Sequence, residues 1–216
     1  MTGATPGFDL DQTDRLLATT RSVRRRLDLD RPVDRATVLE CLRLAVQAPT
    51  ASNGQGWRWV VIDDPDTRRG LGDLYGRMAD RHLRAYRVAG ASPQTERVLA
   101  SANFLADIIA EVPMLVVPCI TGRLADPAPA LAASFYGSII PAVWSFQLAL
   151  RSRGLGSCFT TLHLAAEAEA RDLLAIPDDV TQVALLPVAH TTGGDFSPAR
   201  RPPVEDITYW NRWPDR

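Results

Sequence analysis

The stretch of sequence that most restricts the fold is a long apolar segment in the second half of the chain. Residues 131–153 read LAASFYGSIIPAVWSFQLALRSR and predict a helix. Its apolar residues occur on nearly all faces, so the helix must be buried on several sides. Because Pro141 has no backbone N–H, we expect it to kink the helix and leave the Gly137 carbonyl without its usual partner. Such burial fits a dimer interface or, alternatively, an ordinary core helix.

Length and composition allow one globular domain. The chain has 216 residues, 46% of them hydrophobic and 23% charged, with a formal net charge of −1, which is enough to bury most of its apolar surface. A nearly neutral chain argues against a general nucleic-acid or membrane-surface role, since either needs a broad basic face. We expect no segment that spans a bilayer, because no apolar run approaches roughly 18–20 residues.

The N-terminus and the cysteines indicate a cytoplasmic location. The first residues, MTGATPGFDLDQTD, lack a basic start followed by an apolar core, so we expect no export signal. Cys41, Cys119 and Cys158 are odd in number and widely spaced, with no CxxC pair. We interpret them as reduced thiols.

Periodicity along the chain predicts helices alternating with a few strands. In the fourth predicted helix, Val98, Ala102, Leu105 and Ile109 fall on one face. Few strands among many helices predict an α+β layered domain around one sheet, with residues 1–9 as a flexible tail and 10–216 as a single domain. The predicted helices cover about 10–20, 34–48, 66–86, 94–111, 131–153 and 165–174, and the predicted strands 57–62, 114–120 and 182–191.

An arginine cluster begins at Arg21, where RSVRRRLDLD places four arginines in six positions beside one serine. One interpretation is a solvated basic helix end that meets the negative terminus of the helix dipole. The other is a phosphate site, because guanidinium groups bind phosphate oxygens bidentately and a serine hydroxyl can complete the shell. A second pair, Arg200 and Arg201, could converge on the same phosphate. The chain has neither a Walker A loop nor a GxGxxG stretch.

Two further stretches have the composition of ligand-binding loops. In APTASNGQGWRWVV, residues 48–61, Asn53 and Gln55 carry the donors and acceptors that read the edge of a heteroaromatic ring, although the stretch could also be a simple turn. In RGLGSCFTTL, residues 153–162, glycines permit close backbone approach before a Thr-Thr pair. That stretch could equally be a helix C-cap followed by an edge strand.

In this order and spacing, the stretches resemble the FMN-dependent nitroreductase family. The resemblance covers about residues 16–213 and also includes PAVWSFQLALRSRGLGSCFTT and PARRPPVEDITYWNRW. It implies a three-layer fold with a central mixed, mainly antiparallel sheet flanked by helices. It also implies an intertwined homodimer with shared FMN sites, in which the tail at 202–216 wraps the partner and residues 70–112 form a lid over the substrate.

The resemblance carries site residues onto this chain. It assigns the FMN phosphate to the N-terminal cluster and to Arg201, with Arg200 as the alternative. It gives the flavin edge and ribityl chain to the second stretch, and it places a backbone N–H at Thr160 or Thr161 against flavin N5. The implied cofactor-binding residues are Arg21, Ser22, Arg24, Thr50, Ser52, Asn53, Gln55, Ser157, Cys158, Thr160, Thr161, Arg200 and Arg201.

The implied activity is a ping-pong hydride transfer without an obligatory acid–base side chain. NADH or NADPH reduces FMN at N5 and is replaced by a nitroaromatic, a quinone or a similar flat acceptor. Without a Rossmann fingerprint, the nicotinamide would be held by stacking. Gly56 stands where many relatives have proline, and Thr161 where some have an acidic residue. The three histidines have no metal-ligand spacing, so we expect no metal.

Two other functions stay open on the same scaffold. The chain could be a specialised flavin-dependent dehydrogenase or a flavin-modifying enzyme that acts on a dedicated metabolite. It could also be a non-enzymatic protein that sequesters flavin.

Overall fold

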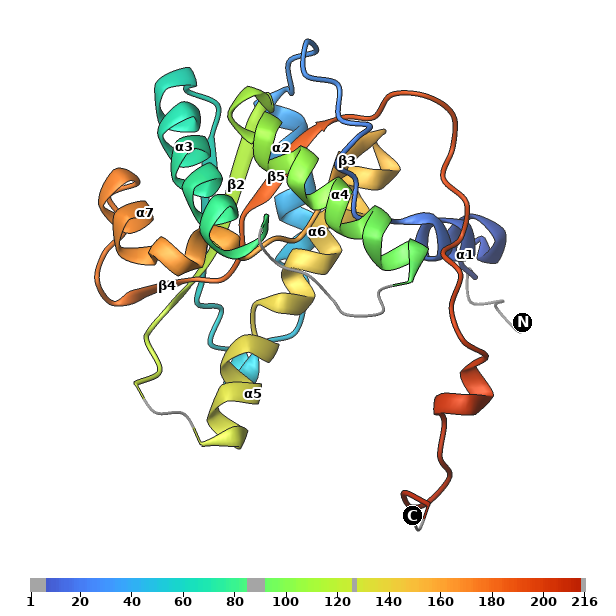
Figure 1. Cartoon of the computed structure of the whole chain (residues 1–216). Helices are drawn as coiled ribbons and strands as arrows, with labels where there is room; N and C mark the ends of the chain where they lie inside the picture. The colour runs from blue at the N-terminus through green and yellow to red at the C-terminus, as the bar shows by residue number, and fades with distance from the viewer. Residues whose placement is uncertain (1–6, 85–91, 126–127, 215–216) are drawn as a thin grey trace, which may run out of the picture.

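A computed structural model describes residues 7–84, 92–125 and 128–214. At its centre is a five-stranded sheet in the order β1-β2-β5-β3, with β4 also pairing with β2 (Figure 1). All the pairings between these strands are antiparallel, and among the described residues the parallel pairings are isolated bridges such as Ser22 with Ser157. The strands are β1 (Trp57–Ile62), β2 (Met114–Thr121), β3 (Leu155–Ser157), β4 (Val180–Gln182) and β5 (Leu186–His190).

Helices connect and cover the strands. Four of them begin at an Asp or Ser whose side chain accepts a hydrogen bond from the backbone N–H three residues further on: Asp9, Asp34, Asp64 and Ser92. The α-helices are α1 (Leu10–Thr19), α2 (Arg35–Ala45), α3 (Pro65–His82), α4 (Pro93–Ile108), α5 (Pro129–Gly137), α6 (Ile140–Ser152) and α7 (Glu167–Leu173). The short 3₁₀ turns are η1 (Ala51–Asn53), η2 (Ile109–Glu111), η3 (Leu162–Ala166) and η4 (Val204–Ile207).

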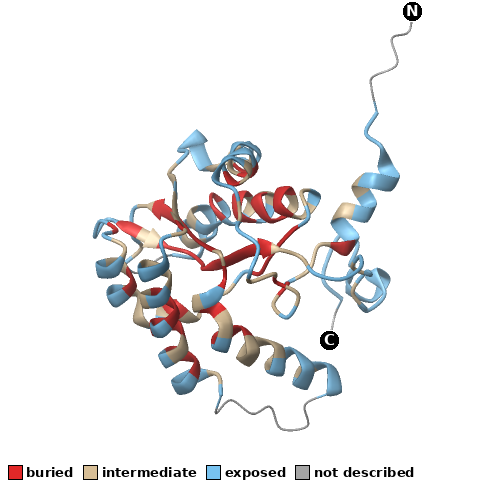
Figure 2. Ribbon diagram, turned by 90° about the horizontal axis from the view of Figure 1, so that it is seen from above, coloured by how far each residue is buried: buried red, intermediate tan, exposed pale blue. Residues whose placement is uncertain are grey.

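Strand β2 organises the three layers because its residues alternate between two hydrophobic cores. Leu115 and Val117 join the core that contains residues of α3, α4 and α7, whereas Met114 and Val116 join the core that contains residues of α2 and α6. The buried residues concentrate in the strands and on the helix faces turned toward them (Figure 2). The expected three-layer α+β arrangement is thus present.

A proline in the middle of β2 marks a change of partner. Residues 114–116 of β2 pair with β5, and residues 119–121 pair with β4. Pro118, which has no backbone N–H to donate, lies between the two ladders, and its carbonyl accepts from Val183 N–H at 2.9 Å. The predicted strand at 182–191 was therefore wrong as a single strand. It is divided into β4 and β5 because each pairs with a different part of β2.

The apolar helix predicted at 131–153 is two helices, α5 and α6, separated at Ser138 and Ile139. Pro141 lies in the first turn of α6, where a missing N–H costs nothing. An 18-residue window within residues 129–152 has a mean hydropathy of 1.2, so this stretch is, by length and composition alone, able to cross a membrane, contrary to our expectation. Core helices of soluble proteins pass the same test.

Two segments at the ends of the chain pack little against the body. Residues 1–6 of the predicted N-terminal tail lie outside the described residues, and residues 7–9 are exposed. After residue 201 the chain leaves the body in an extended path that includes η4 (Figure 1). Val98 on the predicted inner face of α4 is 45% exposed, whereas Leu105 and Ile109 on the same face are buried.

Candidate functional site

The site is a cavity of about 690 Å³ between the N-terminal arginine cluster and α6. One end is basic, and none of its lining residues is acidic. The other end is lined mainly by apolar side chains, with one amide among them. The lining residues are Thr20, Arg21, Ser22, Arg24, Gln94, Val98, Ile140, Trp144, Gln147, Phe159 and Arg201.

The basic end is built where the chain after α1 runs beside the sheet. Ser22 forms a parallel bridge with Ser157, and Val23 N–H donates to the Ser157 carbonyl at 2.9 Å. Val23 is buried in the core, and its neighbours Ser22 and Arg24 line the cavity. The same local pairing therefore presents both a hydroxyl and a guanidinium to one space.

The apolar end presents flat and aliphatic side chains. Ile140 and Trp144 are one turn apart on α6, each with 44% of its surface exposed, and Phe159 is 36% exposed. Gln147, one turn further, is buried, and its Nε2 donates to Ser157 Oγ at 3.0 Å. Large apolar side chains at the rim of a cavity, with one anchored amide behind them, suit a flat heteroaromatic ligand.

The segment after β3 distinguishes the two threonines of the predicted flavin contact. Thr160 N–H donates to the Leu185 carbonyl at 3.2 Å, and its hydroxyl lies 2.7 Å from the Tyr75 hydroxyl. Thr161 is exposed, and its N–H has no hydrogen-bond partner among the described residues. Of the two candidates, Thr161 is the one that keeps a backbone donor for a ligand.

Cys158 lies beneath this segment and is fully buried. Burial raises the pKa of its thiol to about 11, an effect that the nearby Arg24 guanidinium only partly offsets. A thiol with this pKa is protonated at neutral pH and is a poor nucleophile. Its position suits packing behind the site.

Arginines fasten the strap, residues 191–201, that brings Arg201 to the cavity. Arg26 Nε donates to the Thr192 carbonyl at 2.7 Å, and Arg21 donates to the Ser197 carbonyl at 2.8 Å. Asp195 forms ion pairs with both Arg15 and Arg151. The Phe196 ring lies 4.0 Å from the Arg26 guanidinium and 5.0 Å from that of Arg151.

A second cavity, of about 300 Å³, lies between the turn after α2 and helix α5, and Thr50 and Gln55 are among its lining residues. Ser52, Asn53 and Gln55 have φ of 51°, 54° and 47°, in the left-handed region that non-glycine residues rarely adopt. Gln55 Nε2 donates to Asn53 Oδ1 at 2.8 Å. Such strain in a polar loop is typical of a functional site.

The predicted residues therefore fall into two groups on one chain. Arg21, Ser22, Arg24 and Arg201 line the 690 Å³ cavity. Ser157 lies behind its wall, bonded to Gln147, and Cys158 lies beside Arg24, whereas Thr160 and Thr161 are not among the lining residues. Arg200 lines an adjoining cavity instead. Thr50, Ser52, Asn53 and Gln55 belong to the other cavity and its turn, so the chain does not bring the two groups together.

Several cavity residues were missed by the sequence reasoning, notably Gln94, Trp144, Gln147 and Phe159. A single amide inside the apolar run SFQLAL was the signal for Gln147, since a buried amide needs a partner. Nothing in the sequence distinguished Gln94 from other exposed helix residues. Within the described residues no group of three or more His, Cys, Asp or Glu side chains could hold a metal ion.

Comparison with known proteins identifies the family. The model of the nitroreductase family matches residues 17–190, so the chain belongs to this family of flavin enzymes. It is 33% identical over 153 residues to 5,6-dimethylbenzimidazole synthase of Rhodospirillum rubrum, a match that covers 68% of this chain and 67% of that protein.

Solved structures share the fold. Iodotyrosine deiodinase bound to FMN and 3-iodo-L-tyrosine superimposes with a TM-score of 0.71 at 21% identity, covering 92% of this chain and 98% of that chain. The FMN- and NADPH-dependent nitroreductase NfnB of sphigopyxis sp. strain HMH gives 0.66 at 19% identity, covering 93% and 99%.

The residues of the larger cavity fit the cofactor of such enzymes. A phosphate would find guanidinium groups and a hydroxyl at the basic end, with no carboxylate among the lining residues to repel it. A flavin ring would find the apolar side chains of Ile140, Trp144 and Phe159. When bound, FMN supplies hydride acceptance and donation at N5.

Proposed function

We propose that the protein is an FMN-dependent oxidoreductase that takes a hydride from NADH or NADPH and passes it to a nitroaromatic, a quinone or a similar flat acceptor. The observation that carries the proposal is one cavity with a basic end free of acids and an apolar, aromatic end. In it, Arg21, Arg24 and Arg201 hold the phosphate, and Ile140, Trp144 and Phe159 present a surface on which flat molecules stack. Neither part of the reaction needs a proton from a side chain.

Spectroscopy of the flavin-loaded protein tests this function. Under anaerobic conditions NADH or NADPH should bleach the flavin absorbance, and menadione or a nitrobenzene should restore it. Two separate half-reactions are expected because the two substrates use the same cavity in turn. A flavin that is retained but bleached by neither nucleotide would contradict the proposal and favour a protein that sequesters flavin.

A second candidate is a flavin-modifying enzyme or dedicated dehydrogenase. The 33% identity with a protein named 5,6-dimethylbenzimidazole synthase favours it. Chemically reduced, flavin-loaded protein would be exposed to oxygen and its small molecules separated by mass spectrometry. Release of 5,6-dimethylbenzimidazole would establish flavin modification, and recovery of intact FMN would exclude it.

We also infer that the site is completed by a second copy of the chain. Thr50, Ser52, Asn53 and Gln55 line or border a separate cavity, and they would serve the flavin of the partner. The apolar surface of α5 and of the tail supports this arrangement, since Leu131 is 61% exposed and Trp210 83%. The first half of α4, which contributes Gln94 and Val98 to the cavity wall, is the part of residues 70–112 suited to act as a lid. The cytoplasmic location stays a prediction.

A further inference from the structure

Next to the flavin-phosphate end lies a smaller cavity of about 310 Å³ whose lining is also basic. It shares Arg21, Gln94 and Arg201 with the larger cavity and adds Arg97 from α4 and Arg200 from the strap. Trp144, Gln147 and Phe159 do not line it. It therefore continues the larger cavity on the side away from the ring-binding end.

The two cavities together carry more positive charge than a single phosphate neutralises. Five arginines line the pair, namely Arg21, Arg24, Arg97, Arg200 and Arg201, and no lining residue is acidic. None of the five forms an ion pair with an Asp or Glu of the described residues. A phosphate monoester carries about −1.5 to −2 at pH 7, so one FMN leaves roughly three positive charges without an anion.

The two added arginines are held in place by their own surroundings. Arg97 Nη2 donates to Gln94 Oε1 at 2.8 Å, one turn earlier on α4. Arg200 lies in the sequence PARRPP, where prolines restrict the backbone on both sides. The strap that carries it is tied to the body through Asp195 and Phe196. Guanidinium groups from two separate elements thus converge on one space.

We propose that this cavity binds the 2′-phosphate of NADPH and makes the protein prefer NADPH to NADH. The inference rests on the proposed function, because it needs the nicotinamide to stack in the cavity that holds the flavin. With the nicotinamide at the apolar end, only the far end of the dinucleotide reaches beyond the flavin phosphate. That far end differs between the two nucleotides only by the 2′-phosphate, whose dianion suits two convergent guanidinium groups.

Binding without turnover tests the site directly. Calorimetry on the FMN-loaded protein would compare 2′,5′-ADP with 5′-AMP, which lacks the 2′-phosphate. We expect 2′,5′-ADP to bind at least about tenfold more tightly, since hydrogen bonds to charged groups of this kind are worth that much in affinity. Arg97→Gln and Arg200→Gln should each remove most of the difference, whereas Arg69→Gln, on the outer side of α3 beside Asp66, should keep it.

Anaerobic flavin reduction then links the site to the reaction. In Arg97→Gln and in Arg200→Gln we expect the ratio of the apparent Kd for NADPH to that for NADH to rise about tenfold over wild type, and in Arg69→Gln to stay unchanged. Equal binding of the two adenosine phosphates to the wild-type protein would overturn the proposal. So would loss of FMN from the Arg97→Gln and Arg200→Gln proteins, because both arginines would then belong to the flavin phosphate. If 2′,5′-ADP binds as expected but neither nucleotide bleaches the flavin, the anion site stands and the proposed oxidoreductase function fails.

Discussion

The four arginines of residues 21–26 contact different parts of the molecule, although they are neighbours in sequence. Arg21 and Arg24 line the 690 Å³ cavity. Arg25 donates to the Ala100 carbonyl at 3.4 Å and lies 5.1 Å from the Phe104 ring, and Arg26 holds the strap. The positively charged side chains of this cluster therefore contact three different parts of the molecule: the cavity, helix α4 and the strap.

At this scale the phosphate contacts can be tested one at a time. Arg21→Ala, Arg24→Ala and Arg201→Ala should each weaken FMN binding by roughly 1.5–3 kcal/mol, the usual worth of hydrogen bonds to charged groups. Fluorescence titration of the apoprotein with FMN and riboflavin measures the effect, which should appear for FMN only. Arg25→Ala is the matched control, because that side chain faces α4. An equal loss with riboflavin would show that these arginines do not hold the phosphate.

The burial of Cys158 leads to a prediction about thiol chemistry. Because its pKa is raised to about 11, the thiol should resist alkylation by iodoacetamide at pH 8 until the protein unfolds. Cys158→Ala should keep most of the NAD(P)H oxidase activity, since a protonated thiol takes no part in a hydride transfer. Mass spectrometry after timed alkylation checks the first point and steady-state assays the second. Complete loss of turnover with flavin still bound would contradict this account.

His163 gives the folded state a defined acid sensitivity. The side chain is fully buried, its ring nitrogens have no partner among the described residues, and burial lowers its pKa to about 4 against a weaker opposing effect of Glu167. The unfolded chain therefore takes up a proton near pH 6.5, whereas the folded chain does so only near pH 4. Stability present above pH 6.5 is lost as the pH falls between these values, by on the order of 3 kcal/mol.

Urea unfolding at several pH values measures this loss. His163→Leu should flatten the dependence of the unfolding free energy on pH between about 4 and 6.5. The exposed His82 provides the control, since His82→Gln should leave the slope as in the wild type. An unchanged slope in His163→Leu would mean that another group controls the acid sensitivity.

Among the elements, local patterns predicted those whose neighbours are close in sequence. The strand at 57–62 has the predicted bounds, and α2 begins within one residue of the start of the helix predicted at 34–48, because periodicity and capping are local properties. The division of 182–191 into two strands depends on β2, far away in the sequence, and could not be predicted from that stretch. The exposure of Val98 likewise follows from the cavity beside α4 and not from helical spacing.

The same distinction applies to the candidate site. Residue type and order identified the arginines and the polar turn through their resemblance to a family. Gln94 and Arg97 became visible only when the fold placed α4 beside the strap, since exposed polar residues on a helix look alike in sequence. The division of predicted residues between two cavities is also a property of the three-dimensional arrangement.

For the strap, the ion pairs of Asp195 should control how well Arg201 reaches the cavity. The hydrogen bond from Arg15 lowers the pKa of this exposed carboxylate, so it is ionised at neutral pH. Asp195→Asn weakens the pairing with Arg15 and Arg151 and should cause a small loss of FMN affinity, because exposed ion pairs are individually weak. Isothermal titration with FMN and riboflavin, with Asp66→Asn as control, checks this. Loss of helix content in Asp195→Asn would mean a general structural role instead.

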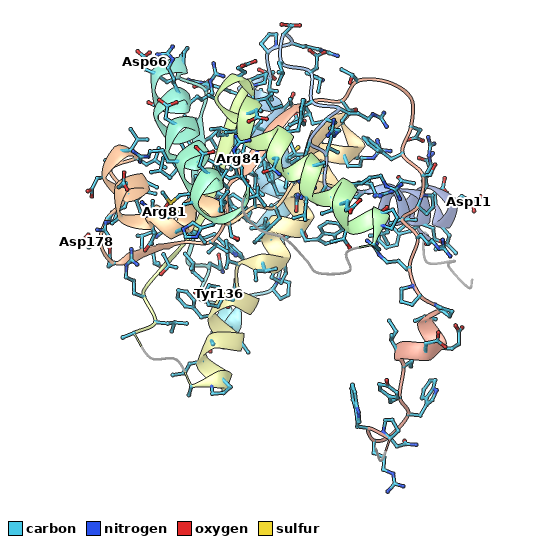
Figure 3. All side chains as sticks on the ribbon, viewed as in Figure 1. Asp11, Asp66, Arg81, Arg84, Tyr136 and Asp178 are labelled. Atoms are coloured by element: carbon cyan, nitrogen blue, oxygen red, sulfur yellow. The ribbon has the colours of Figure 1, made fainter. Side chains whose placement is uncertain are left out.

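Seen whole, the molecule has two parts that extend from its body, α5 and the tail (Figures 1 and 3). None of the described residues of α5 is buried. In the tail, Tyr209 and Trp213 contact each other with ring centroids 4.4 Å apart, while Trp210 is 83% exposed. So much apolar surface on two projecting segments is typical of a surface that a second chain covers.

Deleting residues 205–216 should therefore affect assembly and cofactor together. Trp210 and Trp213 could each bury on the order of 150–250 Å² against a partner. We expect the truncated protein to lose flavin and to dissociate or aggregate. Sedimentation velocity at the flavin absorbance follows mass and cofactor in one experiment. A full-length monomer that keeps stoichiometric FMN at low concentration would contradict the shared site.

The extended path of the tail also bears on the fate of a newly made chain. Residues 202–214 are all exposed, and Arg200–Arg201 and Arg212–Trp213 are peptide bonds that a trypsin-like protease can cut in an accessible segment. In the proposed dimer the partner would cover this segment, whereas a single chain would leave it accessible. The lifetime of a new chain would then depend on how soon it meets a second copy. The amount of intact protein would therefore rise more steeply than its rate of synthesis.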